Sequence, residues 1–351
     1  GNVTLDFKKP IAQAAAFQKQ FQAGFTRGGG LKGITTDVNS FDNALGRATS
    51  RIVSLGAASV VFNTLRKSFG AFAEATIEVE QALAKINVNL GQSADGLKQF
   101  GSQIFNVARQ TGSTFEDAAK GAEELARQGL GAEETLKRLS AALILSRTTG
   151  LGVGESIDSL TSSINTFNKE ALTAADVINR LAAVDTKFAV NSKDLAEAVQ
   201  RVGSSAAEAG VSFNQLLAIV TSVQQTTQRG GATIGNALKT IFTRVGRPEV
   251  LDQLQAIGVA VKDTEGNTLP AIRVLQNLAT TYDGLSAAQK NVVSRQVAGT
   301  FQINILKAAL GDLNKEQSIY NSALKTAGNA QDAAIQKNEQ LNKTLASLLN
   351  S

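Results

Sequence analysis

Only three prolines interrupt the 351-residue sequence, and they are Pro10, Pro248 and Pro270. Proline breaks helix interiors and central strands, so its scarcity over this length favours long helices. Apolar residues make up 43% of the chain, which argues against a wholly disordered polypeptide and is enough for a sizeable core. We therefore expect an all-α fold with two or three domains.

The sequence contains no Cys and no His. Disulfides, thiolate metal sites and cysteine nucleophiles are therefore excluded for this chain, and the commonest general base and zinc ligand are missing. Catalysis by Asp, Glu, Lys or Ser is still open, but no set of side chains converges as a nucleophile with its base. We expect no enzyme activity, no catalytic, cofactor-binding or metal-binding residues, and no cofactor. Met is absent too, including at position 1, so we expect a fragment of a longer product.

Residues 1–71 form the first predicted domain, which is basic. Residues 1–70 hold nine Lys or Arg and three acidic residues, and this charge could face DNA, an acidic protein surface or anionic lipid. No nucleic-acid motif accompanies it, and solvated helix faces explain most of these charges. We expect two helices joined by a hinge at Gly28–Gly30, because glycine is unfavourable in a helix.

A four-three spacing of mainly apolar residues begins near Asp37 and predicts a helix that buries a seam, either against another chain or against the next domain. The positions are Phe41, Leu45, Ala48, Ile52, Leu55, Ser59, Phe62, Arg66, Phe69 and Ala73.

Residues 72–310 form the second predicted domain, a bundle or solenoid-like stack of helical hairpins. Helices are expected to start near Glu133, Thr173 and Phe213, about one solenoid repeat apart, with partners starting near Phe115, Glu155 and Lys193. Capping boxes are predicted at Ser113 with Glu116, Thr173 with Asp176, Ser212 with Gln215, and Ser286 with Gln289. The alternating run Gly258–Lys262 and the turn Asp263–Asn267 predict one short β-hairpin.

Residues 311–351 are predicted to begin a C-terminal coiled-coil helix. Asn338 lies in its seam, where one polar residue can fix register or oligomeric state. The seam positions are Leu324, Ala327, Gln331, Ala334, Asn338, Leu341, Leu345 and Leu348.

Two glycine-rich runs partly resemble nucleotide-binding motifs. Asn236 follows Gly230–Gly235 where a phosphate loop requires lysine, and Gly150–Gly154 lacks the third glycine of a dinucleotide fingerprint. We expect both to be hairpin loops. The acid pairs Glu123-Glu124 and Glu133-Glu134 are expected on first turns or exposed helix faces, without a catalytic role.

Two uncharged segments could be considered for membrane insertion, Ala209–Gln228 and Ile52–Leu65. Polar residues interrupt the first and the second is short, so packed helices are expected in both. A membrane-inserting or pore-forming helical protein is nevertheless kept as the alternative function, and a helical-repeat scaffold as a third.

From about Phe72 to Leu310 the sequence resembles the conserved domain of bacteriophage tail tape measure proteins, the phage minor tail protein family. The similarity is carried by Ala108–Ala119 continuing to Gly129, Ser192–Val199, Ala209–Ser212, Ile234–Phe242, Leu254–Val261, Gly266-Asn267 and Leu285–Gln289. The resemblance implies a virion protein that sets tail length during assembly and leaves ahead of DNA at ejection, from the tube lumen or the tail tip.

The resemblance also implies partners. These are the tail tube protein, tail-tip or baseplate proteins, tail assembly chaperones, further copies of the chain in a trimer, and the host membrane at infection. It implies the host cytoplasm as the location during assembly. The family's shared residues mark its fold, so no active-site residue is carried over.

Overall fold

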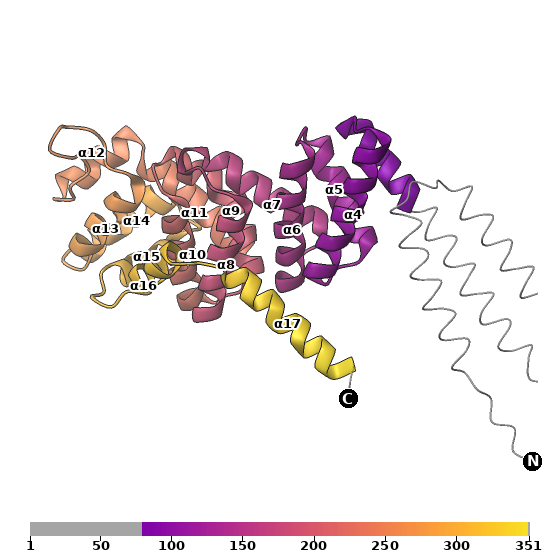
Figure 1. Ribbon diagram of the computed structural model, residues 1–351. Helices are drawn as coiled ribbons and strands as arrows, with labels where there is room; N and C mark the ends of the chain where they lie inside the picture. Colours follow the sequence, from indigo (N-terminus) through magenta and orange to yellow (C-terminus); the bar gives the residue numbers. More distant parts are fainter. Residues whose placement is uncertain (1–78, 350–351) are drawn as a thin grey trace, which may run out of the picture. The chain divides into compact units, whose positions relative to one another are not determined.

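The computed structural model describes residues 79–349 (Figure 1), and all regular structure in that range is helical. The predictions for residues 1–71, the hinge at Gly28–Gly30, the seam from Phe41 to Ala73 and the segment Ile52–Leu65 lie outside the described residues. A helix covers residues 79–90. The labelled helices that follow are α4 (Ala94–Thr111), α5 (Phe115–Arg127), α6 (Ala132–Thr149), α7 (Val153–Thr166), the 3-10 helix η2 (Asn168–Glu170), α8 (Ala174–Lys187), α9 (Ser192–Glu208), α10 (Phe213–Thr227), α11 (Gly231–Val245), α12 (Pro248–Ala256), α13 (Ala271–Tyr282), α14 (Ala287–Ala298), α15 (Ile303–Leu313), α16 (Ile319–Gly328) and α17 (Ala333–Leu349).

Successive helical hairpins stack into two rows. Helices α5, α7, α9 and α11 contact one another in order and form one row, while α4, α6, α8 and α10 form the other. Figure 1 shows these helices following each other along the chain from α4 to α11. The all-α prediction is confirmed for the described residues, and the three predicted hairpins are α5/α6, α7/α8 and α9/α10.

Three of the predicted capping boxes are present, at the starts of α8, α10 and α14. The fourth is wrong by one residue, because Thr114 rather than Ser113 accepts the capping hydrogen bond, from the Asp117 N–H. Gly112 adopts φ 72°, and the Ser113 N–H donates to the Ala108 carbonyl at 2.8 Å. Ser113 is therefore still closing α4 when Thr114 opens α5.

Helix α10 is largely buried, and later helices of the chain pack around it. Six of its eight side chains from Phe213 to Val220 are fully buried, and it contacts α9, α15 and α16. This explains the uncharged stretch Ala209–Gln228 as a packed helix, as predicted. Among the described helices, none is both long and apolar enough to cross a membrane.

The predicted β-hairpin is not formed. Between Gly258 and Pro270 one antiparallel bridge joins Lys262 to Thr268, and the Asp263 carboxylate closes the turn by accepting the N–H groups of Glu265 and Asn267 at 2.9 and 2.8 Å. The pairing ends there because α13 begins at Ala271, whose N–H donates to the Ala209 carbonyl at 2.9 Å and not to the Gly258–Lys262 segment.

The predicted coiled coil stays unconfirmed in residues 311–349. Helix α16 ends at Gly328 and α17 begins at Ala333, so the seam from Leu324 to Leu348 is interrupted. Both helices pack against α8, and α17 also packs against α6. Asn338 is buried in the same chain, and its Oδ1 finds no partner within residues 79–349.

Polar side chains hold α17 in place. The Ala334 N–H donates to Asn179 Oδ1 at 3.0 Å, Lys337 Nζ lies 2.7 Å from Asp185 Oδ2, and Arg147 Nη1 donates to Asn342 Oδ1 at 2.6 Å. Of the α17 side chains whose exposure is described, only Ala334 and Asn338 are buried. The attachment is therefore mainly hydrogen-bonded rather than apolar.

Candidate functional site

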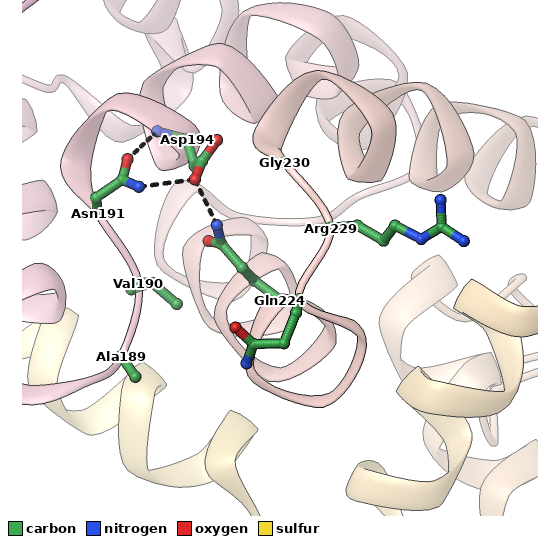
Figure 2. A pocket seen from close by; sticks show the side chains of 8 residues that line it. Ala189, Val190, Asn191, Asp194, Gln224, Arg229 and Gly230 are labelled. Atoms are coloured by element: carbon green, nitrogen blue, oxygen red, sulfur yellow. Dashed lines mark hydrogen bonds between the residues drawn. The ribbon is translucent and has the colours of Figure 1, made fainter.

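An open pocket of about 420 Å³ lies where α9 begins, α10 ends and the chain turns into α11. Figure 2 shows its lining, which is mostly polar. The lining residues are Ala189, Val190, Asn191, Asp194, Gln224, Gln228, Arg229 and Gly230.

The Asp194 carboxylate joins the three helices that meet at this pocket. Its Oδ2 accepts hydrogen bonds from Gln224 Nε2 at 2.6 Å and from Asn191 Nδ2 at 2.8 Å, and its Oδ1 accepts the Gly231 N–H at 2.8 Å. Asn191 in turn caps α9 by accepting the Asp194 N–H at 2.7 Å. Figure 2 shows Asp194, Asn191 and Gln224 turned toward one another. A negative charge at two helix N-termini is favourable because the exposed N–H groups carry partial positive charge.

The glycines of the run Gly230–Gly235 serve close helix packing. A Cβ at Gly231 would lie 1.9 Å from the Asp194 carbonyl oxygen, and one at Gly235 would lie 2.9 Å from the Ala198 carbonyl oxygen. Since Gly231 meets Asp194 and Gly235 meets Ala198, α9 and α11 run in the same direction here. The prediction of a hairpin loop is therefore wrong from Gly231 onward, because only Gly230 precedes the helix.

The run Gly150–Gly154 was also predicted to be a hairpin loop, and most of it lies in the connection between α6 and α7. Gly150 ends α6 with φ 76°, and Gly152 caps α7. Gly154 already lies inside α7, and a Cβ there would meet nothing within 4 Å.

The acid pairs take part in ion pairs within their own helices. Glu124 pairs with Arg127 at 2.6 Å, and Glu134 with Arg138 at 2.7 Å. Glu133 pairs with Lys137 at 2.7 Å, and the hydrogen bond from Lys137 lowers the pKa of the Glu133 carboxyl. These surroundings are those of ordinary exposed helix faces.

One carboxylate, three side-chain amides and one arginine supply the polar groups of the pocket. The Asp194 carboxylate is engaged by three donors, and the Arg229 side chain extends away from it (Figure 2). Within residues 79–349 no group of His, Cys, Asp or Glu side chains could hold a metal ion. The arrangement can fix the mutual positions of α9, α10 and α11, which is a structural task.

The hydrogen-bonded cluster of Asp194, Asn191, Gln224 and Gly231, here called the Asp194 junction, was not predicted from the sequence. Two sequence signals for it were nevertheless present. Asn191 three residues before Asp194 has the spacing of a helix cap, and two glycines four residues apart can mark close helix contact. The remaining partner, Gln224, comes from thirty residues further along and could be placed only by the fold.

Comparison with known proteins gives one family. Residues 102–299 match the family model described as phage-related minor tail protein, a range that runs from within α4 to the end of α14. No solved structure matches the chain.

Proposed function

The chain belongs to the phage-related minor tail protein family, and from that premise we propose that it is the part of a tail tape measure protein that contains the conserved helical domain. A structural role in a phage tail, and a place in the virion tail, come with the family. The proposal adds that the protein sets tail length during assembly and is released ahead of DNA at ejection.

The observation that carries the proposal is that the family match falls on a stack of helices. Residues 102–299 span both helical rows, and the one pocket described within residues 79–349 is lined by groups that tie helices together. Helices advance about 1.5 Å per residue, so a helical chain converts residue number into distance. The compact domain would lie at one end of the tape, with extended helices as the measuring part.

The proposed partners are proteins of the tail and further copies of the chain. We expect the tail tube protein in the lumen, tail-tip or baseplate proteins at the end of the tube, and assembly chaperones before the tube closes. A trimer would suit a bundled tape, and contact with the host membrane would come at infection. The basic residues 1–70 are proposed to face an acidic tube lumen or tip ring.

The test is tail length. An insertion of about 42 helix-forming residues following Ser351 in the full-length protein should lengthen tails by roughly 63 Å, because each helical residue adds about 1.5 Å. The matched control places the same insertion in the exposed turn Asp263–Asn267 of the compact domain, where tail length should not change. Tails of unaltered length in the first variant, measured by electron microscopy, would contradict the tape-measure role.

The position of the domain needs a second test. A gold label in the turn Asp263–Asn267 should appear at one end of each tail. Labels spread evenly along the tube would contradict a domain at the end of the tape while leaving the length measurement unaffected.

A further inference from the structure

Phe301 is the most exposed large apolar side chain among the described residues. It lies between α14 and α15, and 92% of its surface is accessible. Val292 on α14 is 54% exposed. A phenylalanine left in water forgoes the free energy that burial of its ring would contribute. A single exposed apolar residue is common on proteins, so its neighbours decide its meaning.

The Arg244 side chain reaches the end of α14, where Arg295 lies, and Arg247 immediately precedes α12. Arg244 of α11 donates from Nε to the Gln296 carbonyl at 2.7 Å and from Nη2 to the Arg295 carbonyl at 3.3 Å. Arg247 follows three residues after Arg244, and its N–H donates to the Arg244 carbonyl at 3.1 Å. Both Arg247 and Arg295 are exposed, and within residues 79–349 neither takes part in an ion pair.

The chain geometry keeps the backbone of Phe301 close to Arg295 and to the Arg244 side chain. The Gly299 N–H donates to the Arg295 carbonyl at 2.9 Å, the same oxygen that Arg244 contacts. Phe301 is two residues further on, so its Cα lies within about 7.6 Å of the Gly299 Cα. We call the set Arg244, Arg247, Val292, Arg295 and Phe301 the Arg–Phe face.

The charge of the Arg–Phe face is positive but not uniform. The sequence from Ala209 to Pro248 contains no acidic residue. Glu249 and Asp252 follow on α12, which contacts α14, and both are exposed. A polyanion would be repelled by these two carboxylates, whereas a protein surface can present charges of both signs.

From these observations we propose that the Arg–Phe face docks onto another protein of the tail, with Phe301 entering an apolar cleft whose rim is acidic. Aromatic side chains and arginines are enriched at protein interfaces, where a few clustered residues carry most of the binding energy. Arg247 and Arg295 would pair with the acidic rim, and Val292 would widen the apolar contact. The inference rests on the family's place in the tail and not on the tape-measure role.

Two other occupants fit the face less well. Single-stranded nucleic acid is bound by successive aromatic side chains, and this face carries one. In a symmetric pair of copies the same surface would meet itself, so the arginines of one copy would lie opposite those of the other. Both occupants become outcomes of the test.

The test is photo-crosslinking during phage assembly with the full-length protein. A benzophenone amino acid replaces Phe301, and the matched control carries it at Val88, which is 84% exposed and lies before α4. The expected result is a crosslink from position 301 to one tail protein, within a segment rich in Asp or Glu. Its yield should fall at least tenfold in Arg247→Glu/Arg295→Glu, and should not change in Lys169→Glu/Lys262→Glu, whose lysines are also exposed.

Four results would overturn the proposal: a crosslink to DNA, a crosslink to a second copy, a yield no higher than that from position 88, or a yield indifferent to reversal of the two arginines. Phe301→Ser serves as the folding control and should leave the unfolding midpoint unchanged, because the side chain is exposed. If tails have normal length but the crosslink is absent, the docking inference fails while the tape-measure role is unaffected.

Discussion

Replacing Gly231 by alanine should destabilise the protein strongly, against the usual preference for alanine in helices. The added Cβ would lie 1.9, 2.5 and 2.6 Å from the carbonyl oxygen, carbonyl carbon and Cα of Asp194. All three are backbone atoms, so no side-chain rotation can relieve the overlap. Ordinary contact begins at 3.4 Å, so α9 and α11 would have to separate by about 1.5 Å along this line.

The expected cost follows from two effects. Overpacking of a close helix contact costs about 1–3 kcal/mol. The separation would also stretch the 2.8 Å hydrogen bond from the Gly231 N–H to the Asp194 carboxylate, and hydrogen bonds to charged groups contribute about 1.5–3 kcal/mol. Alanine regains up to about 1 kcal/mol of helix propensity. The net loss should be roughly 1.5–5 kcal/mol.

Urea unfolding followed by far-UV circular dichroism would measure this loss. Gly311→Ala is the matched control, because Gly311 lies in α15 and a Cβ there meets nothing within 4 Å. That variant should gain about 0.5–1 kcal/mol. Gly235→Ala should fall between the two, since its Cβ would lie 2.8 Å from the Arg201 Cβ and 2.9 Å from the Ala198 carbonyl oxygen, which is close but less so than the 1.9 Å at Gly231. A Gly231→Ala protein as stable as the parent would refute the close-packing argument.

Three further predictions concern helix capping, α17 and a buried tyrosine. Thr114→Ala should cost about 1 kcal/mol of unfolding free energy and Ser113→Ala roughly a few tenths, because Thr114 is the cap; equal losses in urea unfolding would contradict this. Lys337→Ala should speed amide hydrogen exchange in α17 and leave the exchange rates in α10 unchanged, because it removes the 2.7 Å ion pair with Asp185. Lys343→Ala breaks no ion pair in residues 79–349, so it should not speed exchange in α17. Burial raises the pKa of Tyr320 to about 12 from 10.0. The stability that depends on the protonated phenol is therefore fully present below pH 10 and is lost as the pH rises toward 12. Tyr320→Phe should remove that loss, and ultraviolet titration of the phenol should show ionisation near pH 12.

Much of the fold could be predicted from the sequence, because the local helix signals lie where the packed core also requires helices. Proline scarcity and capping boxes such as Ser212 with Gln215 placed the helices close to their observed starts. The errors arose where two elements compete for the same residues. Ser113 looks like a helix cap but completes the preceding helix, and the turn at Asp263 looks like a hairpin but leads into Pro270.

The junction and the Arg–Phe face could not have been located in this way. Asp194, Gln224 and Gly231 meet only because α9 and α11 pack closely. Phe301 has the same hydrophobicity as the buried Phe242, and only tertiary packing decides that one is exposed and the other is in the core. The family resemblance indicates a tail protein without indicating which surface contacts a neighbour.

The attachment of α17 has a mechanical consequence. Tension applied at Ser351 would reach the helical rows through α17, and would load the contacts at Asn179, Asp185 and Arg147 before it loads the core. Water can replace each of those hydrogen bonds when it breaks. Detachment of α17 would therefore bring few apolar groups into water, because Ala334 is the one buried apolar side chain among those described for this helix.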